Sequence, residues 1–356
     1  MTNLSVQGLQ LLLGFLGVLC LLAAIIGGGF KIFGAEFPEI KSKLAKILLA
    51  VFGVILIAVP TVWAVQPSTN LLNFVSPTDP PADLGRAIPL NFTGANFVLH
   101  PAGLAVDNKG TLYVADHDHN RLLTLASDAS TPTEMQQFAG TNALAWPSGV
   151  AVDNAGTLYV ADSSNNRVLK LAAGAGSNPI EMKEFSGPRY SLDGPLAVAV
   201  DSRFNVYVAD TDHRRVLELP AGSTTPIELP FTSPHLLTPA GVAVDNSFNV
   251  YVTDVDAKRI FKLTKTTPPQ QIPIFSYAGL WGPTGIAVDD HDNVYVTDNS
   301  NQVQRLPAGS TSAAPLNFAG SNLAVPTGVA VDNSFNVYVA NWASGVVFKL
   351  PPPPPK

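Results

Sequence analysis

The sequence predicts an all-β fold, a six-bladed propeller, preceded by two transmembrane helices. Three observations predict it: a motif that recurs six times, strand patterns within each copy, and one strand displaced from the end of the array to its start. The aspartate that closes the first apolar run recurs at intervals of 46, 48, 44, 44 and 43 residues. A repeat of this length is typical of propellers and solenoids. The six aspartates are Asp107, Asp153, Asp201, Asp245, Asp289 and Asp332.

The second copy, Pro147–Leu171, shows the strand patterns of one repeat. Its sequence, PSGVAVDNAGTLYVADSSNNRVLKL, has two apolar runs, GVAVD and LYVAD, separated by the turn formers Asn-Ala-Gly. Runs of Val, Tyr and Leu between such turns are typical of strands. The third run, RVLKL, alternates apolar and polar residues as a half-buried strand does. Each copy therefore predicts three strands.

A fourth strand per blade decides the architecture. Each of the first five copies is followed by a segment that ends in phenylalanine, at Phe138, Phe185, Phe231, Phe275 and Phe318. The sixth copy ends at Leu350 and passes into prolines, which cannot donate to a sheet ladder. A matching segment, Ile88–Phe92, precedes the first copy. We therefore expect a closed ring, in which this N-terminal strand completes the last blade and leaves no open edge.

The N-terminal region predicts a membrane anchor. Leu11–Phe30 and Ile47–Val65 carry no charge, and each is long enough to cross a hydrocarbon core of about 30 Å at about 1.5 Å per residue. The lysines of this region lie between them, which places the loop in the cytoplasm and the propeller outside. Alternatively, Lys41–Gln66 is a signal peptide, and this also exports the propeller. We expect a cell-membrane protein with two spans.

The remaining boundaries follow from composition. We expect a transmembrane hairpin over 1–66, a proline-rich linker over 67–87, the propeller over 88–350 and a polyproline tail over 351–356. Residues 86–349 carry 16 Lys and Arg against 23 Asp and Glu, a net charge of −7. Nucleic-acid-binding proteins concentrate positive charge, so no nucleic acid is expected as a partner.

The patterns P-x-G-V-A-V-D, N-V-Y-V-A-D and N-x-R-V-x-K-L resemble NHL repeats. The phrase LPAGSTTPIELPF, residues 219–231, is similar to the extracellular sensor domain of the mycobacterial receptor serine/threonine kinase D. The chain has no HRD or DFG motif, so we expect no kinase domain. The resemblance implies a six-bladed propeller, but NHL propellers include sensors, RNA binders, a lyase and ligase subunits, so fold alone does not give the function.

Two sets of repeated aspartates are expected to be structural. The first-run aspartates precede turn formers, where a carboxylate accepts backbone N–H bonds; a ring of calcium sites is the alternative. The second-run aspartates are followed five residues later by arginine, which predicts charge-assisted hydrogen bonds between strands or blades. The predicted pairs are Asp116–Arg121, Asp162–Arg167, Asp210–Arg215 and Asp254–Arg259. The arginine is deleted in the fifth copy, and Asn341 and Val346 replace both partners in the sixth.

Binding residues are sought where the copies differ, on the loops of one face. In a four-stranded blade, the connection into the innermost strand and the turn between the second and third strands emerge on the same face. The candidates there are His100, His117, His119, Trp146, His213, Trp281 and Trp342. Exposed aromatic residues suit recognition of a protein, a peptide or a cell-wall carbohydrate, although packing of each tryptophan onto its blade is the alternative.

Two functions follow from these features. The first is a membrane-anchored extracytoplasmic sensor or scaffold that binds its ligand through this face, with no cofactor, metal or catalytic residue assigned. The second is a metal-dependent hydrolase or lyase, which needs carboxylates or histidines that converge near the propeller axis.

Overall fold

The computed structural model describes residues 30–32, 35–37, 86–92, 96–174, 176–231, 235–266, 271–273, 280–310, 312–318 and 321–352. The chain divides into two compact units, residues 1–77 and 78–356. In the first, β1 (Phe30–Ile32) pairs antiparallel with β2 (Ala35–Phe37). Apart from Phe30, the two predicted spans lie outside the described residues. The described residues include no helix with the length and hydropathy that a membrane crossing requires.

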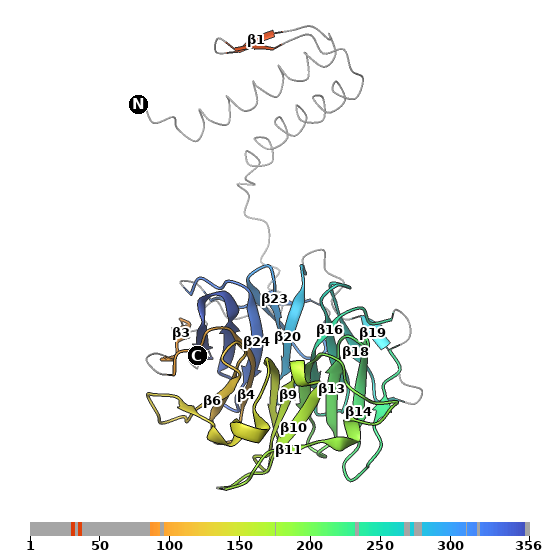
Figure 1. Ribbon diagram of the computed structural model, residues 1–356. Coiled ribbons are helices and arrows are strands. Elements are labelled where there is room, and N and C mark those ends of the chain that lie inside the picture. The colour runs from red at the N-terminus through yellow and green to blue at the C-terminus, as the bar shows by residue number, and fades with distance from the viewer. Residues whose placement is uncertain are drawn as a thin grey trace. The chain divides into compact units, whose positions relative to one another are not determined.

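The second unit is a six-bladed β-propeller, as the sequence predicts, with four antiparallel strands per blade (Figure 1). From the axis outward, blade 1 consists of β4 (Pro101–Val106), β5 (Leu112–Asp116), β6 (Arg121–Leu125) and β7 (Thr133–Glu134). Blade 2 consists of β8 (Pro147–Val152), β9 (Leu158–Asp162), β10 (Arg167–Leu171) and β11 (Ile180–Glu181). Blade 3 consists of β12 (Pro195–Val200), β13 (Val206–Asp210), β14 (Arg215–Leu219) and β15 (Ile227–Glu228).

The second half of the ring repeats this order. Blade 4 consists of β16 (Pro239–Val244), β17 (Val250–Asp254), β18 (Arg259–Leu263) and β19 (Gln271–Pro273). Blade 5 consists of β20 (Pro283–Val288), β21 (Val294–Asp298), β22 (Gln302–Leu306) and β23 (Ala314–Pro315). Blade 6 consists of β24 (Pro326–Val331), β25 (Val337–Asn341), β26 (Val346–Leu350) and the N-terminal β3 (Ile88–Pro89).

The predicted ring closure is confirmed. Strand β3 pairs antiparallel with β26, with Ile88 opposite Lys349 and Pro89 opposite Phe348. The Leu90 N–H extends the pairing by donating to the Val347 carbonyl at 2.8 Å. Figure 1 shows β3 beside the C-terminal end of the chain. The N-terminal and C-terminal parts of the repeat array therefore share one sheet.

The innermost strands approach one another closely around the axis. Their third residue is glycine in five blades, and a Cβ on each of these glycines would overlap the backbone of the next blade. At the closure, a Cβ on Gly328 would overlap the Ala102 carbonyl oxygen. Beside it, the Thr327 hydroxyl donates to the Pro101 carbonyl at 2.8 Å. The glycine of the repeated Pro-x-Gly sequence is thus required by this close approach.

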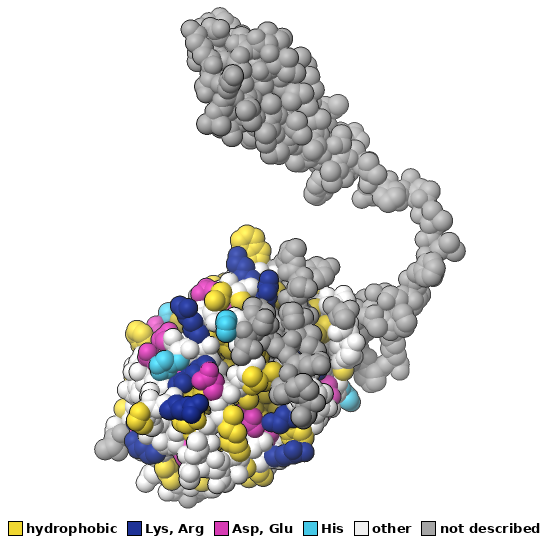
Figure 2. Space-filling model, turned by 90° about the vertical axis from the view of Figure 1, so that its right-hand side faces the viewer, with side chains coloured by type: hydrophobic (Ala, Val, Ile, Leu, Met, Phe, Trp, Pro, Cys, Tyr) yellow, Lys and Arg dark blue, Asp and Glu magenta, His cyan; other side chains and the backbone are white. Residues whose placement is uncertain are grey.

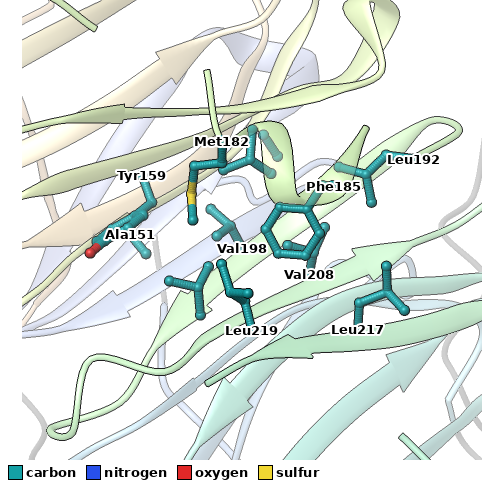
Figure 3. Close-up of a cluster of buried hydrophobic side chains, with 12 residues drawn as sticks. Ala151, Tyr159, Met182, Phe185, Leu192, Val198, Val208, Leu217 and Leu219 are labelled. Carbon is teal, nitrogen blue, oxygen red and sulfur yellow. The ribbon is translucent and has the colours of Figure 1, made fainter. Parts of the chain in front are cut away.

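The outer strands are shorter than the sequence predicts. Each has two residues, or three in β19, and in the five blades whose phenylalanine is described the strand ends before it. Phe275 of blade 4 lies outside the described residues. In blades 1 and 2, short 3-10 turns, η2 (Gln136–Phe138) and η5 (Lys183–Phe185), follow the strand instead. The chain leaves the blade edge here because the phenylalanine is buried between two blades. Figure 3 shows Phe185 packed with Val208 and Leu217 of blade 3.

The first-run aspartates hold the turns between first and second strands, as predicted. Asp245 accepts the N–H groups of Ser247 and Asn249 at 3.0 and 2.8 Å, and the Tyr251 hydroxyl donates to it at 2.9 Å. The same three bonds occur in all six blades. Burial and the nearby carboxylate raise the pKa of all six tyrosines, that of Tyr113 to about 12.

Candidate functional site

The turns between second and third strands define the upper face of the propeller. The residue that ends each second strand is aspartate in five blades and asparagine in the sixth, and all six side chains are fully buried. Each accepts the backbone N–H of the residue 17 positions earlier, which lies on the connection into its own blade. The six donors are Leu99, Ala145, Asp193, Leu237, Trp281 and Ala324. These bonds fix the connections that carry the candidate binding residues.

Three of the four predicted Asp–Arg pairs are present. The Nε–Oδ2 distances are 2.9 Å in Asp116–Arg121 and 2.7 Å in Asp162–Arg167 and Asp210–Arg215. Each arginine also donates to a carbonyl of the incoming connection, such as that of Phe97 at 2.7 Å. The pairs therefore join strands of one blade and its own connection, and they do not join neighbouring blades.

The prediction for Asp254 and Arg259 is wrong. Within the described residues these two side chains form no ion pair, and Arg259 is exposed. Both carboxylate oxygens of Asp254 instead accept backbone N–H groups, from Leu237, Thr238 and Ala257 at 2.7 to 3.0 Å. This carboxylate has enough donors without the guanidinium.

His119 and His213 belong to the same structural device. Their Nδ1 atoms lie 2.8 and 3.0 Å from the buried carboxylates of Asp116 and Asp210. The corresponding residue of blade 2, Asn165, donates to Asp162 at 2.8 Å. An amide at the same position hydrogen-bonds to the same buried carboxylate, so these two histidines stabilise the turn. The prediction that they form a binding surface is not supported by these contacts.

Trp281 lies on the upper face but stands apart from the other tryptophans. Its backbone N–H donates to Asp298 at 3.0 Å, and its side chain is 70% exposed. The Lys258 ammonium group lies 5.3 Å from the centre of its ring. No ring of another described residue stacks on it.

The structure brings four of the predicted residues together across three blades. The His117 ring stacks on Trp146 of the blade 2 connection, with the ring centres 5.4 Å apart. It also contacts the Trp342 ring of blade 6 edge-on, with the ring centres 4.9 Å apart. The Trp342 ring in turn stacks on His100, with the ring centres 4.7 Å apart. We call these four residues the aromatic ladder. Trp342 joins it only because the ring closes and places blade 6 beside blade 1.

Asp118 connects the two histidines of the aromatic ladder. Its Oδ2 lies 2.6 Å from His100 Nδ1 and its Oδ1 lies 2.7 Å from His117 Nδ1. These two hydrogen bonds lower the pKa of Asp118, so the carboxylate is ionised at neutral pH. In each neutral histidine, the proton on Nδ1 faces the carboxylate and Nε2 is an acceptor. Among the described residues, no hydrogen-bond partner reaches His117 Nε2.

An axial cavity of about 300 Å³ opens beside the aromatic ladder. All six innermost strands line it with Gly, Ala, Val, Leu and Ile, and His117 and Trp342 also form part of its wall. Its hydroxyl groups are already engaged: Thr284 and Thr327 donate to carbonyl groups of the next blade, and Ser148 accepts from Ser163. The cavity is therefore largely apolar.

Trp146 has a left-handed backbone at this rim, as do Gly194 and Val325 at the corresponding position before the innermost strands of blades 3 and 6. Its φ is 52°, in the left-handed region, and its side chain is 56% exposed. Its N–H donates to Asn120 Oδ1 of blade 1 at 2.7 Å, which fixes the backbone. The same bond to an asparagine of the preceding blade occurs at both of these positions, so the conformation belongs to the repeat, and the exposed indole is what distinguishes Trp146.

No charge of one sign dominates the side of the propeller in Figure 2, where Lys and Arg side chains are interspersed with Asp and Glu. Within the described parts of the chain, no three or more His, Cys, Asp or Glu side chains converge as metal ligands would. The site that the geometry assembles is thus the aromatic ladder beside the apolar cavity. The sequence predicted the four residues of the ladder but neither Asp118 nor the cavity. The role of Asp118 depends on two histidines that fold against it, and the cavity forms only where six strands meet, so the pattern of one repeat indicates neither.

Comparisons with known proteins agree with the fold. The NHL repeat model matches residues 99–124, 144–171 and 280–302, so the chain contains NHL repeats. No curated protein matches the sequence. A solved gluconolactonase from Xanthomonas campestris is 15% identical, with a TM-score of 0.59 over 76% of this chain and 98% of its own.

Two further solved structures are similar. A virginiamycin B lyase from Staphylococcus aureus is 14% identical, with a TM-score of 0.56 over 75% of this chain and 99% of its own. A PQQ-bound aldose sugar dehydrogenase from Streptomyces coelicolor is 14% identical, with a TM-score of 0.51 over 76% and 99% of the two chains. At these identities the likeness extends to the fold, and the neighbours are enzymes of several kinds.

Proposed function

We propose that this NHL-repeat propeller is a membrane-anchored, extracytoplasmic sensor or scaffold that binds a protein, peptide or carbohydrate ligand of the cell envelope. The ligand binds at the aromatic ladder, over the mouth of the axial cavity. The single observation that carries the binding site is the ladder itself, which gathers two tryptophans and two histidines from three blades beside an apolar cavity.

The energetics of Trp146 support this site. A large apolar side chain that is 56% exposed contributes little to folding. Buried aromatic anchors contribute much of the binding energy at interfaces. A binding role therefore accounts for an exposed tryptophan at this position better than a packing role does.

Membrane anchoring is supported by the two uncharged segments and the lysines between them. The full-length chain is expected to stay in the membrane pellet after a high-salt wash, and protease added to intact spheroplasts is expected to digest the propeller. A Val54→Asp variant places a charge in the second segment, at a cost of about 3 kcal/mol for insertion, and is expected to reduce the membrane-bound fraction. Recovery of the unsubstituted chain in the soluble fraction would contradict the anchor.

The ligand site is tested with matched tryptophan variants. We expect the Trp146→Ala, Trp342→Ala double variant to bind solubilised envelope material about 30-fold more weakly than the unsubstituted chain, the effect of losing a hot spot of about 2 kcal/mol. Trp281→Ala is the control, because this tryptophan lies on the same face outside the ladder and is 70% exposed. Biolayer interferometry with the full-length chain in lipid nanodiscs measures both. Equal binding by the double variant would exclude the ladder.

A hydrolase or lyase is the second candidate, and one observation favours it. The Asp118–His117 pair, with Nε2 left as an acceptor beside the cavity, has the arrangement of a general base oriented by a carboxylate. The metal-dependent form of this candidate requires a bound ion. Elemental analysis of the purified full-length chain would favour it by finding one metal ion per chain, and the absence of bound metal would remove that form.

A further inference from the structure

We infer that the axial cavity receives an aromatic side chain with an N–H or O–H group on its edge, an indole or phenol that a polypeptide ligand presents. This inference rests on the proposed binding function and specifies the group that the ladder and cavity recognise. It depends on three features of the site: an apolar interior, an aromatic rim and an unpaired acceptor on His117.

The interior excludes a sugar as the inserted group. The lining is Gly, Ala, Val, Leu and Ile, and the hydroxyl groups of Thr284, Thr327 and Ser148 are engaged with protein partners. A sugar ring would have to leave its hydroxyl groups without hydrogen-bond partners in this cavity, which opposes its binding. A largely apolar group avoids this cost.

The volume and the rim favour an aromatic ring. An apolar cavity of about 150 Å³ holds benzene, so the axial cavity, at about 300 Å³, has room for the two fused rings of indole. At the mouth, Trp342 and His117 form part of the wall and offer ring faces and edges for stacking. An aliphatic side chain would fill the space without using these contacts.

The acceptor on His117 favours a ligand ring that carries a hydrogen-bond donor on its edge. His117 Nδ1 lies 2.7 Å from Asp118, so the neutral imidazole holds its proton on that side and presents Nε2 as an acceptor. An indole N–H or a phenol O–H supplies the matching donor. A ring without a donor leaves His117 Nε2 unpaired when the mouth is closed, which weakens its binding.

A polypeptide source is favoured by the extent of the site. Trp146 belongs to the aromatic ladder but does not line the cavity, and its side chain is 56% exposed. A ligand that contacts both the cavity and Trp146 must extend beyond the inserted ring. A side chain with its attached backbone meets this requirement, whereas free indole does not.

The test measures binding of small probes to the full-length chain in lipid nanodiscs by titration calorimetry. Indole is expected to bind about fivefold more tightly than indene, which has the same rings without the N–H, as one net hydrogen bond of about 1 kcal/mol predicts. In His117→Leu this ratio is expected to fall to about one. The tripeptide Gly-Trp-Gly is expected to bind more tightly than indole and Gly-Leu-Gly more weakly, whereas chitobiose is expected to compete with neither.

Two variants locate the binding. Ala240→Leu adds volume to the cavity wall at a residue outside the ladder and is expected to abolish indole binding, while Trp281→Ala leaves it unchanged. Circular dichroism and thermal melting verify that each variant is folded; if Ala240→Leu does not fold, Trp342→Ala replaces it. Equal indole binding by the cavity variant, no discrimination between indole and indene, or displacement of indole by chitobiose would overturn the inference. Retention of envelope material is measured separately, so its failure would contradict the proposed function without changing the probe result.

Discussion

The full-length protein is expected to unfold cooperatively as the pH rises from 10 to 12, because the folded state raises the pKa of six of its tyrosines. Each of six tyrosine hydroxyl groups donates to the first-run aspartate of its own blade, and burial together with that carboxylate raises its pKa. In the unfolded chain, tyrosine loses its proton near pH 10. The stabilising effect of protonated tyrosine is therefore complete below about pH 10 and is lost above it.

The magnitude follows from the number of protons. Five of the six tyrosines are at most 5% exposed: Tyr159, Tyr207, Tyr251, Tyr295 and Tyr338. If the unfolded state releases five protons that the folded state retains, the free energy of unfolding falls by about 7 kcal/mol per pH unit. Total stabilities are about 5 to 15 kcal/mol, so a midpoint near pH 11 is expected. Tyrosinate absorbance and far-ultraviolet circular dichroism should change together.

Two variants test the origin of this transition. Tyr251→Phe removes one of the five buried hydroxyl groups and should reduce the slope by about 1.4 kcal/mol per pH unit. Tyr190→Phe is the control, since the Tyr190 ring contacts Arg189 and lies outside the six Asp–Tyr pairs. Ionisation of the tyrosines well before the loss of secondary structure would contradict the prediction, because it would mean that the folded state accommodates tyrosinate.

Gly328→Ala is expected to destabilise the propeller by about 3 kcal/mol or more, the upper range for overpacking. The new Cβ would overlap the Ala102 carbonyl oxygen and would lie 3.0 Å from the Leu104 nitrogen, and both are backbone atoms with little freedom to move. Blades 6 and 1 would have to separate at the axis, next to the bond from Thr327 to Pro101. Urea denaturation of the full-length chain measures the loss.

Gly187→Ala is the matched control for this substitution. A Cβ on Gly187 would have no atom within 4 Å, and its φ lies outside the left-handed region. The same chemical change should therefore alter the free energy of unfolding by less than about 0.5 kcal/mol. If both variants had the same midpoint, the close approach of the innermost strands would not limit the residue at position 328.

The predictions that came from a single repeat were the most successful. Within Pro147–Leu171, alternation and turn residues identify three strands, and the position of Asp153 identifies the hydrogen-bonded turn. These features depend on neighbouring residues along the chain. The errors lie where more distant residues compete: Asp254 takes backbone donors from the incoming connection instead of Arg259, and Phe185 leaves the outer strand to pack against blade 3.

The sequence by itself determined the number of blades and how the ring closes, because strand periodicity is local and the displaced segment Ile88–Phe92 can be counted against the array. It also placed His100, His117, Trp146 and Trp342 on one face. Only the tertiary structure decided which of these meet. Trp342 is more than 200 residues from His117 along the chain, and ring closure alone brings their rings within 4.9 Å. The cavity beside them has no counterpart in any one repeat, since six strands must converge before it exists.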